Sequence, residues 1–201
     1  MARKARKLGK LSISEMRDLI NKKSGTEVAF DLTKDNPTQV KDWIPTGSRW
    51  LDSMICRGHL AGIPVGKVVE IAGLEGSGKS YMAAQIAGNA QKMGIDVVYF
   101  DSESAMAVKA RILAKGMSKL TVPIASSKST FLVLNQLKTN ITSNVAEAMT
   151  TPYVTPGGKA MHYAYSLRIW LTKRKAKASF IIDDNGFRVG SEVKATLKKS
   201  R

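Results

Sequence analysis

The stretch that decides the fold reads Val68-Val69-Glu70-Ile71-Ala72-Gly73-Leu74-Glu75-Gly76-Ser77-Gly78-Lys79-Ser80. Its first part is β-branched and mostly apolar, which predicts a short buried strand. Its second part fits the pattern G-x-x-x-x-G-K-S/T, and a helix is expected over residues 80–93. A glycine-rich turn between a strand and a helix lets several backbone N–H groups converge on phosphate at the helix N-terminus. The sequence therefore predicts a phosphate-binding loop.

Within this loop, two side chains have chemistry of their own. The Lys79 ammonium can reach the outer phosphates of a nucleotide, and the Ser80 hydroxyl can ligate Mg²⁺. We expect Tyr81 to complete the set of nucleotide-binding residues 73–81, with ATP and Mg²⁺ as cofactors. A chance glycine turn is the alternative, and the strand before it and the helix after it argue against that reading.

Downstream of the loop, the pattern continues as an α/β unit. Gly94 ends the expected helix, and residues 97–100 form a second expected strand. A strand–loop–helix–strand unit implies a parallel sheet with right-handed crossovers. Glu103 follows the second strand, where it could orient an attacking water. It could equally cap the next helix, and the spacing leaves both readings open.

The remainder of the chain gives weaker signals. We expect a helix over residues 106–120, a buried strand over 131–134 and a long polar loop over 139–158. Residues 166–171 and 187–197, on either side of Asn185-Gly186, are predicted to be antiparallel strands.

The N-terminal part is expected to be separate from this core. Residues 1–10 are a basic arm, either a DNA contact or a solubilising tail. Ser12 and Glu15 form a capping box for a helix that Gly25 ends, and a neighbouring copy of the protein is a candidate to cover its apolar face. We therefore expect an arm with a polymerisation helix over 1–40 and a core over 41–201.

The charge of the chain points to a polyanionic partner. Its 201 residues include 32 Lys and Arg against 16 Asp and Glu, a net charge of +16, which favours nucleic acid through counterion release. No apolar run is long enough to span a bilayer. The single Cys56 cannot form an internal disulfide, so a reducing cytoplasm is expected.

Taken together, several motifs resemble the nucleotide core of the RecA family. Within that family, their sequences most resemble those of phage UvsX-type recombinases. These motifs are Ile44-Pro-Thr-Gly-Ser48, Leu51-Asp52, Gly62-Ile-Pro-Val-Gly66, Val69-Glu70-Ile71, the loop, Tyr99-Phe-Asp-Ser-Glu103, Leu134-Asn-Gln-Leu-Lys138, Thr155-Pro-Gly-Gly-Lys-Ala160 and Leu167-Arg168. The resemblance implies a RecA-like core, an ATP-driven filament on single-stranded DNA, and strand exchange with duplex DNA in homologous recombination and repair.

The resemblance also implies roles for particular residues. Glu103 matches the catalytic glutamate, and Gln136 matches the glutamine that senses the γ-phosphate. The loop over 138–158 matches a DNA-binding loop. Its candidate DNA contacts are Lys138, Met149, Gly157 and Gly158. Lys199 and Arg201 resemble the basic pair that reaches a neighbour's γ-phosphate, and a solvated basic C-terminus is the alternative.

One part of the family pattern is missing. A buried strand ending in the Walker B aspartate is expected before residue 131, but Ala105 runs directly into Met106. Residues 180–183 have the required form, yet Asn185-Gly186 favours a hairpin there, so we reject them as a replacement. We interpret the chain as internally deleted and truncated after Arg201. Loss of an interior strand predicts a sheet that closes up or is unstable.

Two functions follow from these observations. The first is a DNA-dependent ATPase of recombination, in which Lys79, Glu103 and Gln136 are catalytic. The second is a nucleotide- and DNA-binding protein without hydrolysis, either a truncated paralogue or a filament modulator. The missing Walker B aspartate makes the enzymatic reading uncertain.

Overall fold

The computed structural model describes residues 12–200 except 26, 35, 37–38, 60, 100–109, 157 and 175, and it leaves undescribed the side chains of 110–115, 118, 121 and 158–160. The chain divides into two compact units, Met1–Gln39 and Val40–Arg201.

The first unit contains one described helix, α1 (Ile13–Ser24). The capping box is confirmed: the Ser12 hydroxyl accepts from the Glu15 N–H, and the Glu15 carboxylate accepts from the Ser12 N–H at 2.8 Å. Gly25 ends the helix with a φ of 68°, a left-handed conformation that glycine adopts without steric cost. No residue of α1 is buried, so its apolar face has no cover within the described part of this unit.

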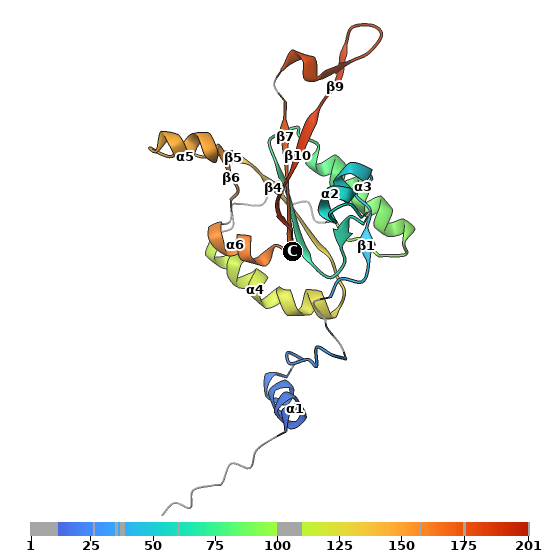
Figure 1. Ribbon diagram of the computed structural model, residues 1–201, viewed down its shortest axis with the longest axis vertical. Helices are drawn as coiled ribbons and strands as arrows, with labels where there is room; N and C mark the ends of the chain where they lie inside the picture. Colours follow the sequence, from blue (N-terminus) through green and yellow to red (C-terminus); the bar gives the residue numbers. More distant parts are fainter. Residues whose placement is uncertain are drawn as a thin grey trace, which may run out of the picture. The chain divides into compact units, whose positions relative to one another are not determined.

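The second unit is built on a four-stranded sheet, with strand order β10-β7-β3-β4 (Figure 1). These strands are β3 (Val68–Gly73), β4 (Phe131–Gln136), β7 (Leu167–Lys173) and β10 (Val193–Ser200). Strand β3 is parallel to both β4 and β7, whereas β10 is antiparallel to β7. The unit is therefore a mixed α/β fold with a mainly parallel sheet, as the sequence predicts.

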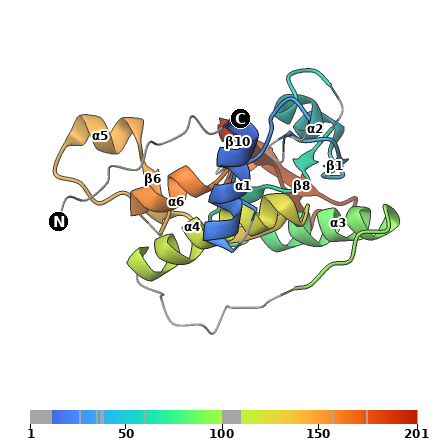
Figure 2. The ribbon, with the colours of Figure 1, turned by 90° about the horizontal axis from the view of Figure 1, so that it is seen from below.

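Helices cover both faces of this sheet (Figure 1). Val69 and Ile71 pack with residues of α2 (Arg49–Ile55) and α3 (Lys79–Lys92), on the side of the short strands β1 (Trp43–Ile44) and β2 (Ile63–Pro64). Val68 points the other way and packs with α4 (Ala110–Ser126) and α6 (Gly158–Ala164), which lie side by side in Figure 2. Because both faces are covered, β3 is completely buried.

Two elements project from this layered core. The first consists of β5 (Lys138–Thr139), α5 (Val145–Thr150) and β6 (Tyr153–Val154), with β5 and β6 paired antiparallel. From here on, the arm means this segment and not the basic N-terminal residues. The long loop predicted over 139–158 is thus partly regular. The second is a hairpin of β8 (Phe180–Ile182) and β9 (Arg188–Ser191), preceded by the short helix η1 (Lys177–Ser179).

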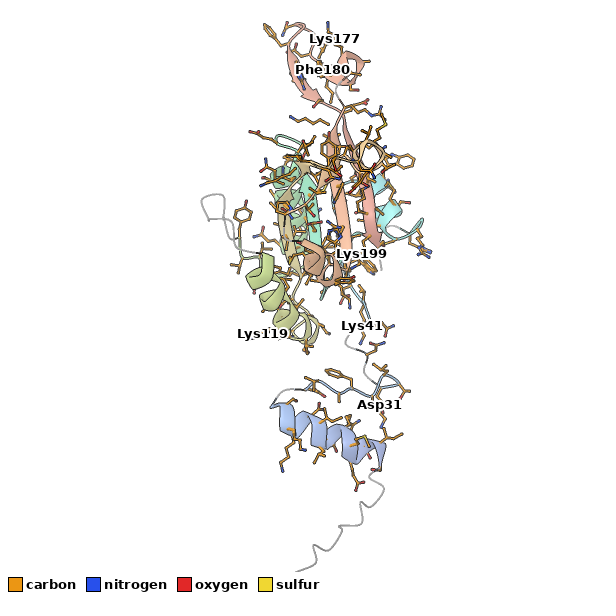
Figure 3. The ribbon with its side chains drawn as sticks, turned by 90° about the vertical axis from the view of Figure 1, so that its left-hand side faces the viewer. Asp31, Lys41, Lys119, Lys177, Phe180 and Lys199 are labelled. Carbon is orange, nitrogen blue, oxygen red and sulfur yellow. The ribbon has the colours of Figure 1, made fainter. Side chains whose placement is uncertain are left out.

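The hairpin agrees with the sequence prediction. Gly186 has a φ of 82°, and the Asp183 carboxylate accepts from the N–H groups of Asn185 and Phe187 at 3.1 and 2.7 Å. Figure 3 labels Lys177 and Phe180 in this element, and Phe180 pairs with Ser191 at the base of the hairpin. Asp183 therefore shapes a turn, which supports the rejection of residues 180–183 as a Walker B strand.

Three expectations need correction. Residues 97–99 form no strand, and Val98 is 74% exposed, because β propensity without a partner strand does not make a ladder. Strand β4 is half-exposed rather than buried, since within the described residues it pairs only with β3. The helix predicted over 106–120 continues to Ser126 and passes through Pro123, and its predicted residues 106–109 lie outside the described ones. The four strands β10, β7, β3 and β4 form one continuous sheet, with β4 at one edge.

Candidate functional site

The glycine-rich loop leaves the sheet between two neighbouring strands. Gly73 ends β3 and lies in register with Gln136 of β4 on one side and with Leu171 of β7 on the other. Carboxyl ends of parallel strands lie at one edge of a sheet, where α/β proteins bind ligands. The fold therefore brings the loop and Gln136, which are far apart in the sequence, to one place.

The loop has the backbone that its glycines predict. Gly76 and Gly78 have φ angles of 60° and 83°, and Gly78 is the N-cap of α3. A side chain in either position would be strained. The loop thus presents the start of a 14-residue helix, whose free N–H groups and dipole favour an anion.

Lys79 is held against the loop itself. Its Nζ donates to the carbonyl oxygens of Gly73 at 3.1 Å and of Leu74 at 2.9 Å. Ser77, within the loop, is buried, and its Oγ has no hydrogen-bond partner among the described residues. Ser80 and Tyr81, by contrast, are exposed. The arrangement leaves Ser80 accessible as a metal ligand and Lys79 close to the place that the sequence predicts for phosphate.

A buried ion pair joins β3 and β7 at a register position nearer the start of these strands. The Arg168 Nε donates to Glu70 Oε2 at 2.6 Å, and the two side chains are 4% and 0% exposed. The Asn135 amide donates to Glu70 Oε1 at 3.0 Å, and an Arg168 N–H donates to the Thr155 hydroxyl at 2.9 Å. Because each partner comes from a different segment, the network ties β3, β4, β7 and the end of the arm together.

The same network perturbs two neighbouring groups. Burial raises the pKa of the Tyr165 hydroxyl, and the Glu70 carboxylate raises it further. Burial and the adjacent Arg168 cation lower the pKa of His162, whose Nδ1 lies 2.9 Å from an Arg168 guanidinium nitrogen. A neutral imidazole can accept that hydrogen bond, whereas an imidazolium would face a like charge.

An apolar contact runs parallel to this polar network. Trp170 and Leu137 are buried together with Ala72, and Leu74 of the loop and Tyr153 of the arm pack against them. The Lys198 ammonium lies 4.7 Å from the centre of the Trp170 ring. Leu137, the first residue after β4, therefore shares one small core with the glycine-rich loop and the arm.

Sequence reasoning assigned no role to Glu70, Asn135, Arg168 or Trp170. A signal was present for two of them, because Glu70 and Arg168 are charged residues within otherwise apolar strands. Glu70 and Arg168 become partners because β3 and β7 are neighbours in the sheet, and the sequence of either strand alone does not reveal that order.

The other predicted residues fall into three groups. Glu103, Gly157 and Arg201 lie outside the described residues. Lys138 and Met149 are exposed on the arm, Met149 at 80%, and Gly158 begins α6. Lys199 extends from β10 to α6 of its own chain, where its Nζ donates to the His162 carbonyl at 2.5 Å; Figure 3 marks its position. Its reach to a neighbouring copy stays a prediction.

The described part of the chain contains neither a cluster of metal-ligating side chains nor a membrane-spanning helix. No group of three or more His, Cys, Asp or Glu side chains is placed to hold a metal ion there. No described helix is both long and apolar enough to cross a membrane.

The fold and the loop together define a mixed α/β protein in which a glycine-rich loop joins the central parallel strand to a helix. A model of the RecA N-terminal domain matches residues 11–109 and 102–201. Since these matches cover most of the chain, the protein belongs to the RecA family.

Individual relatives are similar over much of their length. The protein RecA of Chlamydia felis is 25% identical over 247 positions, which cover 90% of this chain and 67% of the relative. RecA of Rhodopirellula baltica is 27% identical, covering 80% of this chain and 57% of the relative. RecA of Ruminococcus albus is 26% identical, covering 79% and 53% respectively. The chain thus spans between about half and two thirds of these relatives.

Proposed function

We propose that the protein is a recombination and repair protein that binds Mg²⁺ and ATP at residues 73–81 and binds single-stranded DNA as a filament. The observation that carries the proposal is the register of Gly73 with Gln136. A phosphate bound on the loop would lie at the end of β4, and the chain continues from β4 through Leu137 into the arm. The proposed roles are phosphate binding by Lys79, Mg²⁺ ligation by Ser80, and γ-phosphate sensing by Gln136.

The arm is the proposed DNA-binding element. It begins with Lys138, carries the exposed Met149, and contains no buried residue from 138 to 156. Such a surface is free to contact a partner, and the net charge of +16 favours a polyanion. Met149 is unbranched and adaptable, and so is suited to contact unstacked bases. Gly157 and Gly158 complete the proposed DNA contacts.

Filament formation completes the proposal. The uncovered apolar face of α1 is the proposed contact with the next copy, and Lys199 and Arg201 are proposed to act on that copy's nucleotide. The proposed setting is the cytoplasm, and for a phage UvsX-type recombinase it is the cytoplasm of the host cell.

A second function, binding without hydrolysis, is favoured by a specific observation. The alignment with the Chlamydia felis protein spans 247 positions, yet it includes only 90% of the 201 residues of this chain, so the relative has residues within the aligned region that this chain lacks. The two matches of the family model meet at residues 102–109, where the sequence predicts the loss of the Walker B strand. We propose that a Mg²⁺ ligand of the family is missing here, and that Glu103 acts without it or not at all.

ATP hydrolysis measured with and without single-stranded DNA separates the two functions. Hydrolysis that DNA stimulates, and that Lys79→Ala abolishes, supports the enzyme. Nucleotide and DNA binding without turnover in a folded sample supports the second function. A folded protein that binds neither ligand contradicts both.

A further inference from the structure

A second lysine lies at the glycine-rich loop. Lys173 is the last residue of β7, two positions beyond Leu171, the residue that pairs with Gly73. Side chains two positions apart on a strand share a face. Leu171 packs into the core on the α3 side of the sheet, so Lys173 continues that face at the edge where the loop leaves β3.

The ammonium of Lys173 lies against the middle of the loop. A Cβ added to Gly76 would stand 2.6 Å from Lys173 Nζ and 3.4 Å from Cε. The ammonium of Lys173 therefore occupies the space beside Gly76, and a side chain there would have to displace it. The φ of 60° is what requires glycine at this position.

This ammonium has no anionic partner in the described part of the chain. Lys173 is half-buried, and no described hydrogen bond or ion pair involves its Nζ; the ion pairs found there involve Asp18, Glu70 and Glu192. A cation that has lost part of its hydration without gaining a counter-charge is unfavourable. Lys79 brings a second positive charge to the same loop. Two ammonium groups at one loop repel each other, and an anion bound between them would offset that repulsion.

We propose that Lys173 is a second phosphate-binding cation of the nucleotide site, acting in the same chain as Lys79. Lys79 holds the phosphates from the helix side, and Lys173 holds them from the β7 side. The ligand class is a nucleoside diphosphate or triphosphate, because a chain of phosphates offers separate anionic groups to the helix N-terminus and to the middle of the loop. The proposal rests on the proposed nucleotide site and adds a residue to it.

The test compares nucleotides that differ in phosphate number. Mg²⁺ complexes of ATP and ADP, and AMP, are titrated calorimetrically into the wild type and into Lys173→Gln without DNA. Loss of one charge-assisted contact predicts about ten- to hundredfold weaker binding of ATP and ADP, with AMP unchanged. Lys173→Arg should restore most of the affinity. Lys177→Gln, on the exposed η1, is the matched control and should bind as the wild type does.

The outcomes separate this proposal from the one it rests on. Wild-type binding of ATP with equal affinity for Lys173→Gln overturns the role of Lys173 and leaves the nucleotide site intact. A wild type that binds no nucleotide overturns both. Weaker binding of single-stranded DNA with unchanged nucleotide affinity would assign Lys173 to DNA and contradict the proposal. Thermal unfolding of each variant is recorded, and Lys173→Met, which keeps most of the aliphatic stem, replaces Lys173→Gln if that variant does not fold.

Discussion

Strand β3 and the arm show opposite patterns of burial. All six residues of β3 are buried, including Glu70, whereas the arm has no buried residue between 138 and 156. The two regions are nevertheless close in the fold, because β3 pairs with β4 and the chain passes from β4 directly into the arm. The loop that β3 carries is fixed by packing on both sides. The arm is fixed only at its base.

This difference concerns how far other parts of the chain cover each region. The glycine-rich loop follows a strand that is buried on both faces. The conformation of the arm depends on its base, where Thr155 contacts Arg168 and Tyr153 packs against the core of Trp170. Substitutions in β3 and its loop should therefore lower the stability of the fold, whereas substitutions in the arm should weaken binding.

The largest effect is expected from breaking the buried ion pair. Arg168→Met leaves the Glu70 carboxylate buried without its cation, which should lower the free energy of unfolding by about 3 to 5 kcal/mol. Urea denaturation followed by circular dichroism measures the change. The double variant Glu70→Met with Arg168→Met removes both charges and should lose much less. A single variant within about 1 kcal/mol of the wild type would show that the pair is not the buried anchor of the sheet.

A smaller loss of stability is expected at the start of the loop. A Cβ on Gly73 would collide with Ser77 Oγ and would lie 2.8 Å from the Leu171 carbonyl oxygen. The second of these is backbone and cannot rotate away, so Gly73→Ala should destabilise by about 1 to 3 kcal/mol. Gly88→Ala, in α3, has nothing within 4 Å of the added carbon and is the control. Equal stability of both variants would mean that β3 and β7 can separate at this edge without cost.

In the arm, stability should hardly change while binding does. Met149 is exposed, so Met149→Ala should alter the free energy of unfolding by less than about 0.5 kcal/mol. Its affinity for single-stranded DNA should fall several-fold if the arm contacts DNA. Met93→Ala, an exposed methionine beyond the end of α3, is the matched control. Unchanged DNA affinity at low salt would remove Met149 from the proposed contacts.

The smallest effect concerns pH at the base of the arm. The pKa of His162 is lowered in the folded protein, so the unfolded chain takes up a proton first as the pH falls through 6.5. The contribution of His162 to stability is complete above that pH and is lost below it. His162→Asn should make the free energy of unfolding less dependent on pH between about 7.5 and 5.5. The side chain is largely exposed and only partly desolvated, so the difference is small; a steeper dependence in the variant would contradict the sign.

The sequence was informative where local pattern determines structure. The loop lies between β3 and α3 as its glycines predict, and the Ser12 and Glu15 capping box forms as expected. The Asn185-Gly186 turn also closes a hairpin. In each case the physical cause acts over a few neighbouring residues. Strand β3 was predictable because apolar β-branched residues surround Glu70.

Prediction failed where structure depends on distant partners. Residues 97–99 have the composition of a strand, yet no described strand accepts them. Strand β4 was expected to be buried, but its exposure depends on whether another strand flanks it. The same limit applies to the site. Lys173 and Gly76 are far apart in the sequence, and only the pairing of β3 with β7 brings them together, so their approach could not be predicted.

The central claim is that nucleotide on the loop and DNA on the arm are coupled through the end of β4. The most direct test is the affinity for single-stranded DNA at fixed salt, measured by fluorescence anisotropy with and without a saturating, non-hydrolysable ATP analogue and Mg²⁺. Because coupling between two binding sites is reciprocal, this readout needs no hydrolysis. We predict several-fold tighter DNA binding with nucleotide, and loss of that difference in Gln136→Ala. Equal DNA affinity with and without bound nucleotide in the wild type would contradict the account.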